Sequence, residues 1–150
     1  MFLQWLARAE NPYLGVLAGI VATLLVQSSS VTVGLAILLV QQGLLPAEAA
    51  IPMVIGANIG TTSTGLLASV SMKPVARATA VANFGFNTAG VLVYLPFLVP
   101  FSRYMVERFG GAEFAVAWAH LIFNITVAVP FLLFLPLVER LLRERVLAGR

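Results

Sequence analysis

The sequence contains little charge, no cysteine and a single histidine. Only 10% of its 150 residues are charged, whereas 60% are hydrophobic, and the mean hydropathy is +0.97. A soluble globular domain carries about 25% charged residues, so this chain has too few polar groups to cover a water-facing surface. The lack of cysteine excludes disulfides and thiolate metal sites. The composition therefore places most of the chain in lipid.

Four long stretches contain no charged residue: 11–47, 49–72, 78–102 and 114–138. Each exceeds the roughly 20 residues that a helix needs to cross the hydrocarbon core. Long period-2 alternation, which is typical of membrane β-strands, is missing. We therefore expect an all-α membrane protein with about four hydrophobic segments. The short connections predict a single transmembrane domain over residues 1–150.

The first segment, Leu14 to about Gly43, is too long for one simple crossing and has Gln27-Ser28-Ser29-Ser30 at its middle. This pattern predicts a broken helix, either as two half-helices that together cross the membrane or as a re-entrant hairpin. Serines compete for backbone hydrogen bonds, which favours local unwinding at this point.

The other three segments are expected at residues 51–70, 79 to about 101, and 114–138. The glycine-rich string Gly56–Thr62 predicts an interruption of the second segment, because glycine permits backbone conformations that break a helix. Pro130 predicts a kink in the fourth segment, since proline removes a backbone donor and clashes with the preceding turn.

Basic residues are distributed unequally between the two ends of the predicted segments. If all four segments cross, one side holds two basic residues, Arg103 and Arg108, and the other holds Arg8, Lys73, Arg77, Arg140, Arg143, Arg145 and Arg150. Lys and Arg concentrate in cytoplasmic loops. We therefore expect a multi-pass protein of the cell (inner) membrane with both termini in the cytoplasm. The same result follows if segments one and two are both re-entrant, so the charges leave these topologies open.

The first candidate site is the polar cluster in the middle of segment one. A lone Ser in a membrane helix is usually satisfied by the carbonyl one turn earlier. Four consecutive polar residues expose more donors and acceptors than lipid can satisfy, which favours a functional role. The cluster comprises Thr23, Gln27, Ser28, Ser29, Ser30 and Thr32.

The second candidate site lies in segment two, where hydroxyl and amide side chains alternate with glycine: Gly56, Asn58, Gly60, Thr61, Thr62, Ser63, Thr64 and Gly65. If the helix breaks here, a new half-helix begins with unpaired amide groups, which attract anions. The alternative is a glycine-rich packing face, because small residues let helices approach closely.

The chemistry available to both clusters is limited to neutral oxygens and amides. No carboxylate lies within any segment, so a cation can be held only by hydroxyl, amide and backbone carbonyl oxygens, which suit a monovalent alkali ion. A transition metal would need imidazole or thiolate ligands. The lone His120 is a poor ligand on this basis, and we expect it to hydrogen-bond a neighbour such as Asn124.

Three motifs together resemble the type II sodium/phosphate cotransporter family: Gln27-Ser28-Ser29-Ser30, Gly56-Ala57-Asn58-Ile59-Gly60-Thr61-Thr62 and Ala119-His120-Leu121-Ile122-Phe123-Asn124. Their order and spacing are similar to those of one of the family's two inverted repeats, the second. The resemblance implies sodium-coupled uptake of inorganic phosphate, no enzymatic activity and no cofactor beyond the coupling ion sodium. No nucleic-acid partner is expected, because seven of the nine basic residues lie at the termini or in the Lys73–Arg77 connection, where orientation signals belong.

The resemblance also implies which residues bind substrate and sodium: Gln27, Ser28, Ser29, Ser30, Thr32, Asn58, Gly60, Thr61 and Thr62, with Asn87, His120 and Asn124 in support. Sodium would be held by Ser, Thr, Asn and Gln side chains and by backbone oxygens. Family members carry the Gln-Ser-Ser-Ser motif twice, whereas this sequence carries it once. A second, oppositely oriented repeat is therefore expected as a partner, as a separate chain, a missing part of the gene product or a second copy.

Two other classes of function remain open from the sequence. A non-transporting membrane assembly subunit would explain the half-size chain but not the polar groups at mid-segment. An intramembrane serine hydrolase would need a base, for which His120 is the sole candidate, and no Gly-x-Ser-x-Gly elbow accompanies the serines.

Overall fold

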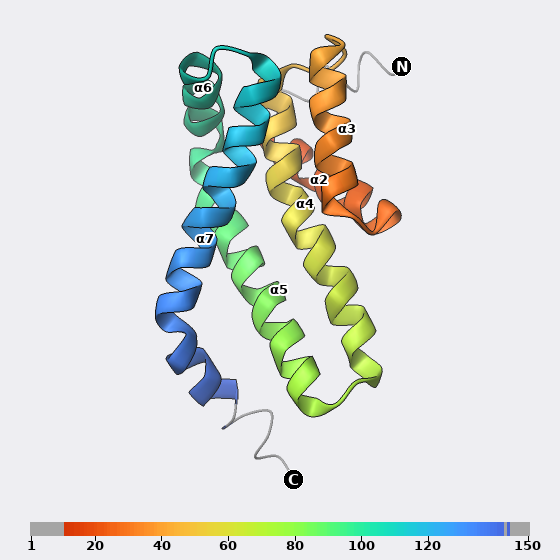
Figure 1. Ribbon diagram of the computed structural model, residues 1–150, viewed down its shortest axis with the longest axis vertical. Helices are drawn as coiled ribbons and strands as arrows, with labels where there is room; N and C mark the ends of the chain where they lie inside the picture. The colour runs from red at the N-terminus through yellow and green to blue at the C-terminus, as the bar shows by residue number, and fades with distance from the viewer. Residues whose placement is uncertain (1–10, 143, 145–150) are drawn as a thin grey trace.

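The computed structural model describes residues 11–142 and residue 144. Six α-helices are described (Figure 1): α2 (Pro12–Val26), α3 (Ser29–Gln41), α4 (Ala47–Ala68), α5 (Pro74–Tyr94), α6 (Leu98–Arg108) and α7 (Ala112–Leu142). Short 3₁₀ turns, Ser69–Ser71 and Leu95–Phe97, follow α4 and α5. No strand occurs among the described residues, and the prediction of an all-α membrane protein is confirmed.

Three stretches are long and apolar enough to cross a membrane: Ala47–Ser71, Pro74–Arg108 and Ala112–Arg140. The third predicted segment thus begins earlier than expected and ends in the amphipathic helix α6. The fourth is helix α7, which continues through Pro130 and Pro136. Its ribbon changes direction in the part that contains these prolines, as proline in a helix favours (Figure 1).

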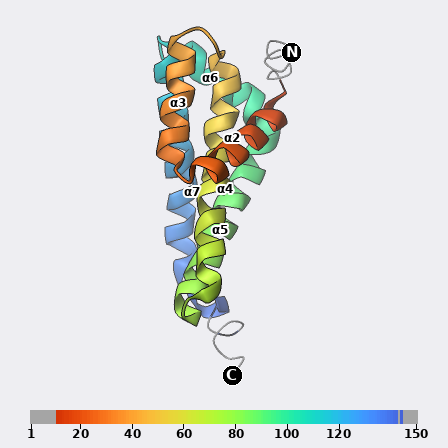
Figure 2. The ribbon, with the colours of Figure 1, turned by 90° about the vertical axis from the view of Figure 1, so that its right-hand side faces the viewer.

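Segment one forms a re-entrant hairpin. Helix α2 has 15 residues and α3 has 13, which at 1.5 Å per residue gives arms of roughly 20 Å, short of the roughly 30 Å hydrocarbon core. Figure 2 shows both arms meeting at about half the height of the bundle and returning toward the end occupied by α6. The predicted break is confirmed, and it joins two arms that turn back.

Local signals explain where the arms begin and end. Asn11 caps α2, because its side-chain oxygen accepts a hydrogen bond from the Tyr13 amide at 3.0 Å, and Pro12 occupies the first helical position. The helix ends at Gln27, and Ser28 caps the start of α3. The polar break therefore stops one helix and starts the next within two residues.

Helix α4 is continuous, and the prediction that Gly56–Thr62 interrupts segment two is wrong. The glycines serve helix packing. A Cβ atom added at Gly56 would overlap the backbone of Val16 in α2, and one added at Gly19 would overlap the backbone of Met53 in α4. Small residues allow this close crossing of α2 and α4.

The core is centred on α4. Ile51, Val54 and Ile55 in this helix are fully buried, and they belong to one cluster with Val116 and Phe123 of α7. Helix α5 joins α7 through a hydrogen bond of 2.7 Å between the hydroxyls of Tyr94 and Thr126. Helix α4 therefore packs on one side against the hairpin, through its glycines, and on another against α7, through its buried apolar residues.

The prediction that both termini are cytoplasmic concerns residues 1–10 and 145–150, which lie outside the described residues. In the described part, α2 begins in the upper half of the bundle and α7 ends at the lower end (Figures 1 and 2). The expectation assumed an even number of crossings. A hairpin followed by three spanning helices gives an odd number, which puts the start of α2 and the end of α7 on opposite sides of the membrane.

Candidate functional site at the hairpin tip

The tip begins at Gln27, which has a left-handed backbone conformation with φ of 58°. Among the residues that the structure describes, it is the only non-glycine residue with a positive φ. Its amide donates a hydrogen bond of 2.7 Å to the carbonyl oxygen of Thr23, which closes the last turn of α2. The side chain is exposed, and it has no hydrogen-bond partner among the described residues. Left-handed strain of this kind in a non-glycine residue is concentrated at functional sites.

Ser28 organises the first turn of α3. Its hydroxyl accepts a hydrogen bond of 3.4 Å from the Val31 amide, and its carbonyl oxygen accepts from both the amide and the hydroxyl of Thr32, each at 3.1 Å. The Ser28 side chain is therefore a helix cap. Its hydroxyl is committed to the fold more strongly than those of the next two serines.

The two arms are joined by a hydrogen bond between Thr23 and Thr32. The Thr23 hydroxyl donates to the Thr32 hydroxyl at 3.0 Å, and both side chains are buried. Thr32 was predicted to bind substrate or sodium, whereas in this geometry its hydroxyl lies between Thr23 and the backbone of Ser28. The signal for this pair was present in the sequence, because the two threonines flank the break four residues away on each side.

Several polar side chains at the tip form no hydrogen bond within the described part of the chain. The side chains of Gln27, Ser29 and Ser30 have no hydrogen-bond partner in the described part of the chain; Gln27 and Ser30 are exposed and Ser29 is half-buried. The carbonyl end of α2 and the amide end of α3 also meet here. Carbonyl ends of helices carry partial negative charge and amide ends partial positive charge, so one tip can attract a cation and an anion.

The second motif lies inside α4 and supports the tip. A Cβ atom added at Gly60 would lie 2.6 Å from the Cβ atom of Thr23, so glycine lets the hairpin rest on α4. The Asn58 amide nitrogen donates to the carbonyl oxygens of Val54 and Ile55 at 3.2 and 3.3 Å. These bonds keep the amide within its own helix.

The hydroxyls of this motif divide into two groups. The buried Thr62 hydroxyl donates to the Asn58 carbonyl oxygen at 3.0 Å, whereas Thr61 is exposed. Because α4 is unbroken, the motif forms no second helix N-terminus. Of the residues that the sequence assigned to it, Thr61 remains the one whose side chain is both exposed and uncommitted within the described residues.

The supporting residues form a separate group between α5 and α7. Asn87 and Asn124 line a cavity of about 160 Å³ together with Asn83, and His120 is not among its lining residues. The Asn124 amide donates to the His120 carbonyl oxygen at 2.7 Å, and the Asn87 amide donates to that of Asn83 at 2.9 Å. The expected contact between His120 and Asn124 therefore exists, but it uses the His120 backbone.

Fold and site define a helical membrane protein in which a half-crossing hairpin brings two helix ends and a polar tip to mid-depth. The family of Na+/Pi-cotransporters matches residues 2–96, which is more than half of the chain. The chain belongs to this family, as the sequence motifs predicted.

The chain is similar to several longer proteins. It is 34% identical over 130 residues to the uncharacterized protein YqeW of Bacillus subtilis, covering 87% of this chain and 41% of that protein. It is 37% identical over 118 residues to sodium-dependent phosphate transport protein 2C of Mus musculus, covering 74% and 19% respectively. For protein 2B of Bos taurus the identity is 33% over 132 residues, covering 83% and 18%. No solved structure matches the chain significantly. The chain thus spans less than half the length of YqeW and about a fifth of the two mammalian relatives.

Proposed function

We propose that this chain supplies one repeat of a sodium-coupled phosphate transporter, with the hairpin tip as its binding site. Family membership and the printed names of the mammalian relatives support sodium-dependent phosphate transport. The observation that carries the proposal is the tip itself: Gln27, Ser29 and Ser30 present uncommitted polar groups where two helix ends meet.

The two helix ends suggest that each binds a different ion. Sodium is held near the carbonyl end of α2 by backbone oxygens and the Gln27 amide oxygen. Phosphate is held at the start of α3 by backbone amides and the hydroxyls of Ser29 and Ser30. Sodium offsets the charge of the phosphate, so binding both together costs less free energy than binding phosphate alone. The coupling ion thereby determines when phosphate is bound.

The exposure of the tip supports a second repeat. Gln27 and Ser30 are exposed at half the height of the bundle. Polar groups at this depth cannot face hydrocarbon without a large free-energy cost, so they face either protein or a water-filled path. An oppositely oriented repeat placed against this tip supplies both a cover and the other half of the site.

The orientation follows from the basic residues once three crossings are counted. Lys73 and Arg77 lie at the α4–α5 connection, and Arg140 lies near the same end of the bundle, at the end of α7. Arg103 and Arg108 lie in α6 at the other end. Including the basic residues that precede α2 and follow α7, the first side still carries more Lys and Arg. We therefore place the α4–α5 connection in the cytoplasm of the inner membrane and the open base of the hairpin on the opposite side.

The test is uptake of radiolabelled phosphate into proteoliposomes under an inward sodium or potassium gradient. The chain is reconstituted alone and together with an oppositely oriented repeat. We expect uptake to require sodium and to fall at least tenfold in a Ser29→Ala/Ser30→Ala double variant, because two hydrogen bonds to a charged ligand are lost. Ser71→Ala, in the 3₁₀ turn that follows α4 and away from the tip, is the control. Uptake that is equal in sodium and potassium, or unaffected in the double variant, contradicts the proposal.

A further inference from the structure

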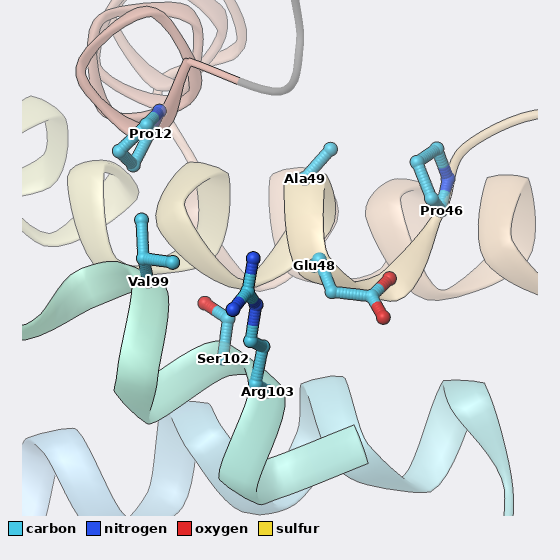
Figure 3. A pocket seen from close by; sticks show the side chains of 7 residues that line it. All are labelled: Pro12, Pro46, Glu48, Ala49, Val99, Ser102 and Arg103. Atoms are coloured by element: carbon cyan, nitrogen blue, oxygen red, sulfur yellow. The ribbon is translucent and has the colours of Figure 1, made fainter. Parts of the chain in front are cut away.

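A second polar cavity lies outside the hairpin tip. It has a volume of about 590 Å³ and lies between α6, the start of α4 and the start of α2 (Figure 3). Pro12, Pro46 and Val99 form apolar parts of its wall, and Glu48, Ser102 and Arg103 supply its polar side chains. These elements meet at the end of the bundle where the hairpin opens, so the cavity lies at the level of the membrane–water boundary.

Two opposite charges face this cavity without being paired. Figure 3 shows the Arg103 guanidinium reaching from α6 into the space below α4, and the Glu48 carboxylate on the α4 side. Neither group forms an ion pair with any described residue. A bare anion near Arg103 would be repelled by Glu48, and a bare cation near Glu48 would be repelled by Arg103. A ligand that carries a negative and a positive charge a short distance apart can pair with Arg103 and Glu48 at the same time.

Ser102 is a second, independent indication of a ligand. The residue is 98% buried, and its hydroxyl oxygen is buried without a hydrogen-bond partner in the part of the chain that the structure describes. Such an orphaned buried hydroxyl is costly and needs an explanation. It precedes Arg103 in α6, and in Figure 3 both side chains rise from the same helix toward the cavity. A phosphoryl oxygen bound by Arg103 could accept a hydrogen bond from this hydroxyl as well.

We propose that this cavity binds the headgroup of a zwitterionic phospholipid with a primary amine, phosphatidylethanolamine. The phosphoryl oxygens accept hydrogen bonds from the Arg103 guanidinium, whose planar fork suits phosphate, and from the Ser102 hydroxyl. The ammonium group donates to the Glu48 carboxylate. The apolar wall at Pro12 and Val99 contacts the glycerol end of the lipid.

The position of the cavity favours a lipid over a free ion. Tyr13 and Tyr104, next to the lining residues Pro12 and Arg103, are both more than half exposed. Exposed tyrosines of this kind are typical of the headgroup level of a membrane. Because one lipid bridges the hairpin base, α4 and α6, its binding fixes the base of the hairpin against the spanning helices.

The proposal is tested by lipid binding to the full chain in detergent, measured by native mass spectrometry. The lipids are phosphatidylethanolamine, phosphatidylcholine and phosphatidylglycerol with identical acyl chains. We expect phosphatidylethanolamine to bind most tightly, and Arg103→Gln to weaken its binding roughly tenfold, which is the effect of losing a charged hydrogen bond. Glu48→Gln removes the preference over phosphatidylglycerol, because the ammonium loses its partner. Arg108→Gln, in the same helix but outside the cavity, leaves binding unchanged.

Two outcomes overturn the lipid assignment. One is equal binding of all three lipids to the unmodified chain and to Arg103→Gln. The other is displacement of all three lipids to the same extent by inorganic phosphate at millimolar concentration. That result would identify a site for anions in general. Thermal melting without lipid checks that each variant folds. If Arg103→Gln does not fold, Arg103→Lys replaces it in the assay. This variant keeps the positive charge but loses the planar fork, so we expect it to bind phosphatidylethanolamine with intermediate affinity. The assay needs no transport, so its result is separate from that of the uptake experiment.

Discussion

The Thr23 hydroxyl donates a hydrogen bond of 3.0 Å to the Thr32 hydroxyl, and this bond joins the two arms of the hairpin one turn from its tip. Both residues are buried, so water cannot replace the lost partner if either hydroxyl is removed. The pair therefore fixes the angle at which the carbonyl end of α2 meets the amide end of α3. Its contribution can be measured separately from ligand binding.

We expect Thr23→Val to lower the free energy of unfolding by about 1 kcal/mol, the usual size of such a bond within a membrane protein. Valine has nearly the same shape, so packing against Gly60 is kept. The measurement is unfolding by SDS in mixed micelles, followed by circular dichroism. Thr79→Val is the control, because that hydroxyl is exposed and donates only to the Val75 carbonyl of its own helix. Equal effects of the two variants would show that the bond between the arms contributes nothing.

The glycines of α4 provide a second prediction. Gly56→Ala is expected to destabilise the protein by at least 1–3 kcal/mol, because the new methyl group would overlap the backbone of Val16 and force α2 away. Gly65→Ala is the control in the same helix, since nothing lies within 4 Å of its added Cβ. There alanine should stabilise by up to about 1 kcal/mol through its higher helix propensity. A similar melting temperature for both variants would contradict the close crossing of α2 and α4.

Gln27 combines backbone strain with a free amide, and two substitutions separate these roles. Both Gln27→Gly and Gln27→Ala remove the amide, so phosphate uptake should fall in both. Only glycine relieves the left-handed conformation, which costs other residues about 1–2 kcal/mol. We therefore expect the glycine variant to be about 1 kcal/mol more stable than the alanine variant in SDS unfolding. If the alanine variant is the more stable, the left-handed turn at the tip is wrong.

Neighbouring serines should respond differently to the same change. Ser28→Ala removes a helix cap, so it is expected to cost about 1 kcal/mol of stability. Ser29→Ala removes a hydroxyl without a partner among the described residues, so stability should change by less than about 0.5 kcal/mol. Its effect should be on transport, as higher sodium and phosphate concentrations for half-maximal uptake. Loss of stability without loss of transport in Ser29→Ala would mean that Ser29 supports the fold and not the site.

The tip could be predicted from the sequence because its signals are local. Gln27 and Ser28 stop one helix and cap the next through bonds to residues no more than four positions away. The role of Gly56 could not be decided in this way. A glycine can break a helix or admit a neighbour, and the neighbour here, Val16, is 40 positions earlier in the chain. The competing interpretation as a packing face was available, but only the placement of α2 across α4 decides between them.

The direction of segment one depends on tertiary structure for the same reason. Its length fits either a crossing or a hairpin, and the bond between Thr23 and Thr32 exists only in the hairpin. Once the arms turn back, the number of crossings changes from even to odd. The expected side of the N-terminal end then changes too, although the charges are the same.

This topology can be tested with single cysteines, because the chain contains none. Tyr13→Cys, Gln42→Cys and Ser71→Cys place an accessible thiol at the start of α2, at the end of α3 and after α4, where all three side chains are exposed. A membrane-impermeant maleimide added to intact cells should label the first two and reach the third only after permeabilisation. The unmodified chain is the blank.

Labelling of Tyr13→Cys and Gln42→Cys from opposite sides would mean that segment one crosses the membrane and that the hairpin is wrong. Labelling of Ser71→Cys alone in intact cells would keep the hairpin but reverse the orientation, so that the basic α4–α5 connection would lie outside and the base of the hairpin would lie in the cytoplasm.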